Sequence, residues 1–137
     1  MTRLRILAES SNFILAHEYE SVFVINCATG EQTHAGDHYG DPQCGVIFPD
    51  ESWFATGGDG VAIFNFQKGI QNYLRNGQPH YSISAMRYEP PNNIRILVDP
   101  WSDIPSVWIL TPTTGDLIKL HDGPDLRNEE YRGSVLY

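Results

Sequence analysis

The sequence contains few cysteines, few basic residues and no long apolar segment, and each shortage excludes a class of protein. Its two cysteines, Cys27 and Cys44, are too few for a disulfide framework, and they lack the spacing of a zinc-binding or thioredoxin-like motif. The apolar stretch near the N-terminus is shorter than that of a secretory signal. No segment approaches the roughly 20 apolar residues that a membrane helix requires. We therefore expect a cytoplasmic protein with reduced thiols and no membrane contact.

Positive charge is also scarce. The chain carries 9 Lys and Arg residues against 17 Asp and Glu residues, which gives a formal net charge of −8. A nucleic-acid backbone would be repelled by such a surface, so we expect no direct binding of DNA or RNA. An acidic surface suits a basic protein partner, because complementary fields speed association. Solubility alone is the other explanation of this charge.

The sequence lacks the motifs of the common catalytic sites. It has no GxSxG elbow, HExxH helix, Walker A loop or dinucleotide fingerprint. Glu129 and Glu130 are adjacent, so they would not hold the opposed geometry of an acid–base pair. His34 and His38 flank a glycine in "HAGDH", which we interpret either as an ordinary surface loop or as a His-Asp-His metal site. We therefore expect no catalytic residue and no cofactor.

What the sequence does contain is a nine-residue pattern that occurs three times. It reads "VFVINCATG" at 22–30, "VAIFNFQKG" at 61–69 and "VWILTPTTG" at 107–115. The copies align without gaps, and their closing glycines are 39 and 46 residues apart. Such a fixed spacing is typical of proteins built from repeated structural units.

The similarity between the copies extends upstream and downstream of this pattern. An apolar stretch, a polar turn and a second apolar stretch precede each copy, as "RILAESSNFILA" (5–16), "GVIFPDESWFAT" (45–56) and "AMRYEPPNNIRILV" (85–98). The turns are rich in Asn, Asp, Ser and Pro, which favour tight turns, and "GGDG" (57–60) is typical of a hairpin. A fourth short strand, "EQTH", "IQNYL" or "DLIKL", follows each glycine, although 67–76 could instead form one helical turn. Each unit is therefore predicted to be a meander of four antiparallel strands.

The order of these features resembles that of the WD40-type β-propeller blade. The stretch "FPDESWFATGGDGVAIFNFQKG" has the blade's strand, turn, strand, hairpin and closing strand in sequence, and the similarity covers residues 4 to 120. The chain departs from the family because it lacks the Gly-His pair and has Asn26, Asn65 and Thr111 where the family's Asp is expected. The resemblance implies an all-β fold with three propeller-blade-like antiparallel meanders, at about 4–40, 44–80 and 83–120, in one compact domain, 1–137.

The repeated segments are apolar at consecutive positions, which is typical of strands buried on both faces. We therefore expect the large aromatic side chains of the repeats to pack in the core. These are Trp53, Phe64, Phe66 and Trp108.

Three blades are fewer than the about four to eight of an ordinary closed propeller. The segment "GSVLY" (133–137) aligns with "CGVIF" (44–48) and "SAMRY" (84–88), so it is predicted to be the opening strand of a fourth unit. Three arrangements follow: this strand pairs with the first repeat, two chains complete a six-bladed ring as a homodimer, or the sheets wrap into a three-sided barrel. We favour a compact domain closed by the C-terminal strand or by dimerisation, because an unpaired apolar edge invites aggregation.

Function is expected in the loops that the copies do not share, since binding residues often lie on loops held by a rigid scaffold. Two loops combine acids with an aromatic residue that could anchor an interface, and the C-terminal stretch is also acidic. The candidate partner-binding residues are Asp37, Tyr39, Asp41, Asp99, Trp101, Asp103, Asp122, Asp125, Glu129 and Glu130.

In size and charge the chain resembles the bacterial immunity proteins of contact-dependent inhibition. This resemblance implies a non-enzymatic protein that binds and blocks a basic toxin domain, such as a nuclease. The alternative is a propeller-like interaction scaffold that dimerises or assembles with other blades.

Overall fold

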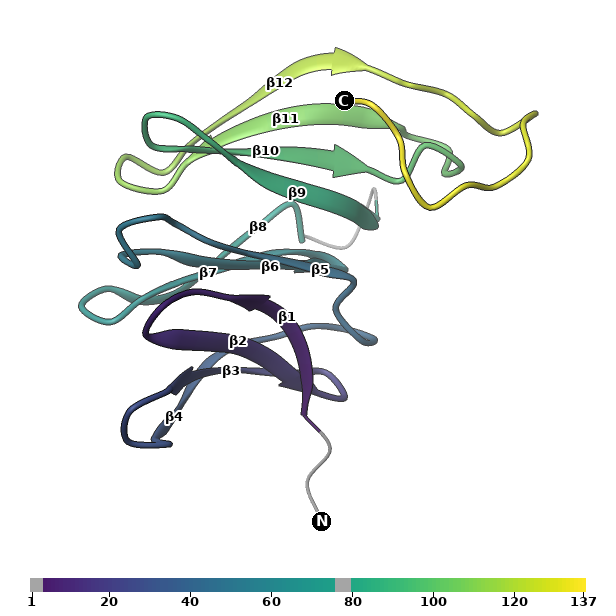
Figure 1. The fold of residues 1–137 in the computed structure, drawn as a ribbon. Helices are drawn as coiled ribbons and strands as arrows, with labels where there is room; N and C mark the ends of the chain where they lie inside the picture. The colour runs from purple at the N-terminus through teal and green to yellow at the C-terminus, as the bar shows by residue number, and fades with distance from the viewer. Residues whose placement is uncertain (1–3, 76–79) are drawn as a thin grey trace.

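In the part of the chain that the structure describes, twelve β-strands form three four-stranded antiparallel sheets that are stacked one on the next (Figure 1). The computed structural model describes residues 4–75 and 80–137, so residues 76–79 of the second predicted repeat lie outside the described residues. The first sheet contains β1 (Arg5–Glu9), β2 (Phe13–Glu18), β3 (Ser21–Asn26) and β4 (Gln32–Asp37). The second contains β5 (Cys44–Ile47), β6 (Phe54–Gly58), β7 (Gly60–Asn65) and β8 (Gly69–Tyr73). The third contains β9 (Ile83–Glu89), β10 (Asn93–Val98), β11 (Ser106–Thr111) and β12 (Asp116–Asp122).

Each sheet is a meander, because its strands pair in chain order. The predicted all-β architecture of three blade-like repeats is confirmed. "IQNYL" begins within β8 rather than in a helical turn. Among residues 4–75 and 80–137, no helix is long and apolar enough to cross a membrane.

The nine-residue pattern forms the third strand of each sheet and the turn that follows it. The side-chain oxygens of Asn26 and Asn65 accept hydrogen bonds from the backbone amides two and three residues later, at 2.9 to 3.2 Å. The closing residues Gly30, Gly69 and Gly115 have φ of 74°, 75° and 79°. This left-handed conformation strains any residue with a Cβ, so the pattern recurs because the turn requires it.

Replacement of Asn65 by alanine is expected to lower the free energy of unfolding by about 1–2 kcal/mol. The substitution removes the two turn bonds and a third bond, in which Asn65 Nδ2 donates to the carbonyl of Ser52 at 2.9 Å. Urea unfolding would measure the loss. Asn65→Asp is the matched control: it keeps the acceptor and should lose only part of this stability, and equal stability of Asn65→Ala and the wild type would contradict the assignment.

The core lies in two layers, one on each side of the second sheet. Leu15, Val22 and Val24 of the first sheet pack against Phe54 and Phe64 of the second. The other layer joins the opposite face of the second sheet to the third sheet, through residues such as Ile63, Ile83, Ile94 and Ile96. Strands β6 and β7 are therefore buried on both faces, whereas among the described residues another sheet covers the first and third sheets on one face only.

The predicted core aromatics fall into two groups. Trp53 and Phe64 are 4% and 5% exposed, as predicted, and Trp108 is partly buried. The prediction for Phe66 was wrong, because this ring lies in the turn after β7 and is 52% exposed. It covers the end of the core by contacting the Phe64 ring at a centroid distance of 5.1 Å.

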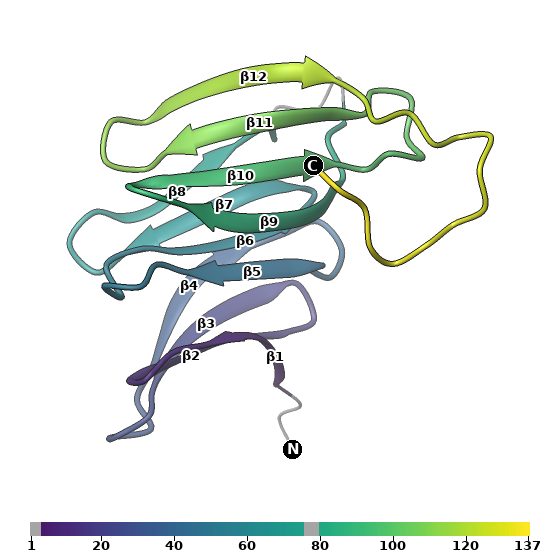
Figure 2. The ribbon, with the colours of Figure 1, turned by 45° about the horizontal axis from the view of Figure 1, so that its top comes forward.

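The predicted strand at residues 133–137 is not formed. After β12 the chain runs irregularly and returns so that its end lies beside the third sheet in both views (Figures 1 and 2). Arg87 of β9 donates from Nη2 to the backbone oxygen of Tyr137 at 2.6 Å, and its guanidinium lies 4.7 Å from the centre of the Tyr137 ring. The segment is thus held by a side chain rather than by a backbone ladder, which a strand would require.

Candidate functional site

The predicted partner-binding residues gather at one end of the stacked sheets. This acidic end consists of the β4–β5 connection (38–43), the β10–β11 connection (99–105) and the segment after β12 (123–132). Because strand direction alternates in a meander, every second connection reaches the same end. Asp37 and Asp122 end the strands that lead into this end.

The ten residues form two groups at the acidic end, since the second sheet separates the first sheet from the third. The smaller group belongs to the first sheet and comprises Asp37, Tyr39 and Asp41. The larger group belongs to the third sheet and comprises Asp99, Trp101, Asp103, Asp122, Asp125, Glu129 and Glu130. Within this group Arg127 lies 2.7 Å from Asp125 and 3.6 Å from Asp103, which draws the loop and the C-terminal segment together.

Four of the eight predicted carboxylates have a Lys or Arg partner in the chain. Asp122 pairs with Lys119 at 2.8 Å, and Glu129 pairs with Arg132 at 3.4 Å. The hydrogen bond from Lys119 lowers the pKa of Asp122, so this carboxylate stays ionised. Asp41, Asp99 and Glu130 have no ion-pair partner among the described residues. Asp99 is half-buried and accepts a hydrogen bond from the Trp101 backbone amide at 2.9 Å, so Asp41 and Glu130 are the exposed free charges of the predicted set.

Asp37 has a weaker partner, His34, whose Nε2 lies 3.1 Å from Oδ1. Slight burial acts to raise the pKa of Asp37, but the hydrogen bonds from His34 and Ser21 outweigh it and the pKa is lowered. The sequence "HAGDH" was expected to be a loop, yet its first four residues belong to β4. Gly36 is needed there because a Cβ would lie 3.0 Å from the Cβ of Ala62 in the second sheet.

The two predicted aromatic anchors differ in their surroundings. Tyr39 is 83% exposed in the β4–β5 connection. Trp101 is partly buried, because its ring packs 5.0 Å from that of Tyr131 and its Nε1 donates to the carbonyl of Glu129 at 3.0 Å. Of the two predicted anchors, Tyr39 is therefore the one whose ring is free in solvent.

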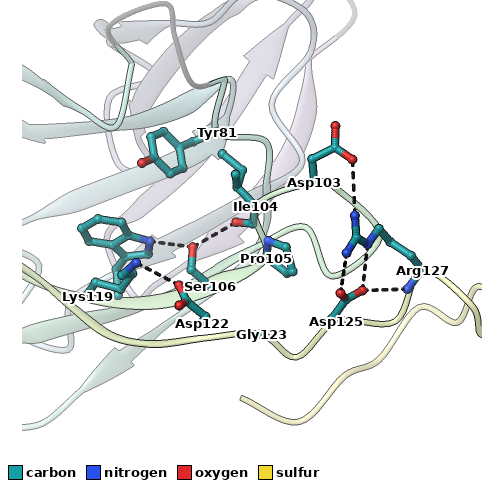
Figure 3. A pocket seen from close by; sticks show the side chains of 11 residues that line it. Tyr81, Asp103, Ile104, Pro105, Ser106, Lys119, Asp122, Gly123, Asp125 and Arg127 are labelled. Carbon is teal, nitrogen blue, oxygen red and sulfur yellow. Dashed lines mark hydrogen bonds and ion pairs between the residues drawn. The ribbon is translucent and has the colours of Figure 1, made fainter.

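A pocket of about 310 Å³ lies beside the larger group (Figure 3). Its apolar wall includes Tyr81, Ile104 and Trp108. The ion pair of Lys119 and Asp122 lies at one side, and Arg127 lies between Asp103 and Asp125 at the other (Figure 3). Sequence reasoning found the three aspartates of this pocket but missed its aromatic wall and both cations. Trp108 had been assigned to the core, and no local signal shows that Lys119 is its cross-strand neighbour.

A buried polar cluster lies beneath the smaller group. His38 is 5% exposed; its Nε2 lies 2.8 Å from Thr56 Oγ1, and Arg75 Nη2 lies 2.9 Å from its Nδ1. Burial, and then the nearby Arg75 charge, lower the pKa of His38 to about 4. Since His34 bonds Asp37 instead, the two histidines of "HAGDH" serve different partners.

Proteins similar to this chain are found among solved structures. No protein-family model matches the chain, and no curated protein sequence matches it. Among solved structures, it is similar to the β-propeller domain of Cps50 (Swd1) from Myceliophteria thermophila, with a TM-score of 0.63 and 14% identity. That similarity covers 90% of this chain and 38% of the Cps50 chain. Hsv2p from Kluyveromyces lactis matches with a TM-score of 0.42 and 13% identity, over 81% of this chain and 50% of that one. The fold is therefore β-propeller-like, with three four-stranded blades.

Proposed function

We propose that this chain is a non-enzymatic protein-interaction scaffold of the propeller type, which acts in the cytoplasm and binds a basic partner at its acidic end. The observation that carries the proposal is the arrangement of that end. Connections from the first and third sheets meet the solvent on the same side, with Tyr39 83% exposed and with Asp41 and Glu130 free of ion-pair partners among the described residues.

The chemistry of this end favours a partner with Lys or Arg side chains beside an apolar contact. Exposed carboxylates attract such a segment and speed its encounter, while the partly exposed aromatic wall of the pocket offers apolar area. The ion pairs at the pocket rim are exposed, so each is weak and can exchange one partner for a charge on a bound protein.

A lysine-rich peptide is expected to bind more tightly than a glutamate-rich peptide of equal length, and its binding should weaken as salt is added. The double variant Asp41→Asn, Glu130→Gln should weaken this binding by about 3-fold to 10-fold, because it removes two unpaired charges. Fluorescence anisotropy with labelled peptides would measure both effects.

Asp116→Asn is the matched control for this experiment. Asp116 is exposed at the start of β12, in the turn after β11, which lies at the opposite end of the sheets. The variant loses a negative charge without changing the acidic end, so it should bind the lysine-rich peptide like the wild type. Equal weakening by Asp116→Asn would show that only net charge matters and would contradict a localised site.

A narrower form of this proposal is an immunity protein whose basic partner is a toxin domain, most plausibly a nuclease. The net charge of −8 and the free carboxylates of the acidic end favour it, because a nuclease cleft is positively charged. The acidic end would then occupy that cleft and exclude the nucleic acid. Co-expression with a nuclease toxin of the native host should restore growth, and failure to recover a basic partner or to rescue growth would contradict this form.

A further inference from the structure

Within residues 4–75 and 80–137, the first and third sheets each have one face that no other sheet covers. On the first sheet, ladder pairing places Ile6, Ala16, Phe23 and His34 in one row across this outer face. Ile6 is 57% exposed, and Phe23 is only partly buried. The opposite face of the same sheet carries Leu15, Val22 and Val24, which pack against the second sheet. The outer face therefore presents apolar side chains that have no partner sheet among the described residues.

Comparison of the three repeats shows that the outer face of the first sheet corresponds to faces that are packed against another sheet in the other two copies. Phe23 and Ile25 are the third-strand residues that face away from the second sheet, and each has an equivalent in the other two copies. The equivalent residues are Ala62 and Phe64 in the second copy and Trp108 and Leu110 in the third. Phe64 packs into the core toward the first sheet, and Leu110 packs into the core toward the second. At both internal junctions these positions pack against the preceding sheet. Phe23 and Ile25 occupy the same positions in the first sheet, but no sheet among the described residues packs against them.

The outer face of the third sheet corresponds to the face that packs against the following sheet in the first two copies. Val24 and Ile63 face the following sheet in the first and second copies, and their equivalent in the third copy is Ile109. Ile109 pairs across the strands with Ile118, which is 60% exposed, and Arg95 and Arg87 continue the same row. Ile109 and Ile118 therefore have no following sheet among the described residues, whereas Val107, on the same face, is already buried within the chain.

We propose that a second copy of this chain docks the outer face of its third sheet on the outer face of the first sheet, so that two such junctions close a six-bladed ring. The inference extends the proposed scaffold function by naming one partner, and it does not depend on binding at the acidic end. Two copies supply six blades, within the about four to eight of closed propellers. A two-fold axis makes both junctions identical, as in most cyclic dimers.

Charge on the two outer faces supports the pairing of unlike faces. Strand alternation places Glu9 and Glu18 on the outer face of the first sheet. The outer face of the third sheet carries Arg87 and Arg95, of which Arg95 is already paired with Glu89 at 2.9 Å. Two first-sheet faces would bring like charges together, whereas a first-sheet face against a third-sheet face brings carboxylates to arginines.

The segment 133–137 competes for this junction. Arg87 holds Tyr137 through a hydrogen bond and a ring contact, so the segment lies over part of the third-sheet face. Docking of a second copy must displace it. Removal of residues 133–137 should therefore strengthen dimerisation, by about 10-fold if the segment covers the face nine-tenths of the time.

Mass measured by analytical ultracentrifugation over a concentration series tests the proposal. The wild type should form a dimer and no larger species. Phe23→Glu and Ile109→Glu should each raise the dimer dissociation constant by at least about 100-fold, because each places a charge in both apolar junctions. Tyr39→Glu is the matched control, since it makes the same kind of change on an 83% exposed ring away from both faces, and it should leave the dimer unchanged.

Mixing the two disruptive variants gives the most specific readout. In a mixed ring one junction carries both substitutions and the other carries neither, so the mixture should dimerise more tightly than either variant alone. A dimer through two first-sheet faces would be lost in Phe23→Glu but kept in Ile109→Glu. Ile6→Glu and Ile118→Glu, at positions 57% and 60% exposed, provide second variants, and thermal unfolding confirms that each chain is folded.

Three results would overturn the inference. They are a wild type that stays monomeric at high concentration, a dimer that survives both substitutions, and open filaments in place of a closed ring. None of them bears on the scaffold function itself, because binding of the lysine-rich peptide is measured separately and should persist in the folded Phe23→Glu variant.

Discussion

Gly57→Ala is expected to lower the free energy of unfolding by about 2–3 kcal/mol, although it adds a single methyl group. Gly57 lies in β6, where the second sheet faces β9 of the third. A Cβ at this position would lie 2.6 Å from Cγ2 of Ile83 and 2.9 Å from Sγ of Cys44. Both neighbours are packed in the core, so the sheets must separate or Ile83 must leave its rotamer. Loss of unfolded-state entropy offsets only about 0.4–1 kcal/mol of this cost.

Urea unfolding of three variants would establish that the cost comes from this contact. Gly133→Ala is the control, because nothing lies within 4 Å of its Cβ position, and it should change stability by less than about 0.5 kcal/mol. Ile83→Ala alone creates a cavity and should cost about 2–5 kcal/mol. The double variant Gly57→Ala, Ile83→Ala should cost less than the sum of the two, since the new methyl group partly fills the cavity. Strict additivity would contradict the predicted clash.

The features that could be predicted from sequence are those that local chemistry determines. The turn after each repeated strand ends in a glycine with positive φ, and in the first two copies it begins with an Asn whose side chain accepts the turn's backbone hydrogen bonds. The same residue types therefore recur where this turn forms. Four such strands per repeat follow from the spacing of the turns. The blade plan was therefore visible in the sequence, and the structure confirms it.

The features that could not be predicted depend on which sheet lies next to which. "GSVLY" has the composition of a strand, but a strand forms only where another backbone offers a free ladder, and here Arg87 meets the segment with its side chain. Gly36 suggested a loop, whereas the structure uses it to bring β4 close to Ala62 of β7. Both errors have the same origin, which is that contacts between sheets leave no periodic signal in the strand itself.

The acidic end likewise has features that the sequence could predict and features that it could not. The count of acidic residues predicted a negative surface, and the repeats predicted which loops would differ. Neither could show that Lys119, Arg127 and Arg132 neutralise much of that surface, because these partners become neighbours through the register of β12 and the path of the chain beyond it. Within the predicted set, fewer carboxylates carry free charge than the composition implied, and the exposed unpaired ones are Asp41 and Glu130.

Acidification is expected to destabilise the fold through His38, by about 2.5 kcal/mol between about pH 7.5 and about pH 4.5. Arg75 donates a hydrogen bond to Nδ1, so that nitrogen carries no proton, and the Nε2 proton is directed at Thr56 Oγ1. A second proton on the ring would break the bond from Arg75 and place two positive charges together in a buried site. Burial and Arg75 accordingly lower the pKa of His38 from 6.5 to about 4, against smaller opposing effects of Asp59 and Asp37.

The sign of the effect follows from which state binds the proton. Below about pH 6.5 the unfolded chain protonates this histidine while the folded chain does not, so the free energy of unfolding falls until the pH reaches the folded pKa of about 4. Carboxylates also titrate in this range, so the measured quantity is the difference in pH slope between the wild type and His38→Gln, each unfolded with urea. The variant should lack this contribution, and equal slopes would contradict it.

Arg75→Met separates the two causes of the shift. It removes the guanidinium but leaves His38 buried against Thr56, so the pKa of His38 should rise only part of the way to its ordinary value. The acid-induced loss of stability would then shrink without disappearing. NMR titration of the His38 ring protons reads the folded-state pKa directly, and a value near 6.5 in the wild type would show that the ring is protonated within the cluster, contrary to the hydrogen-bond pattern.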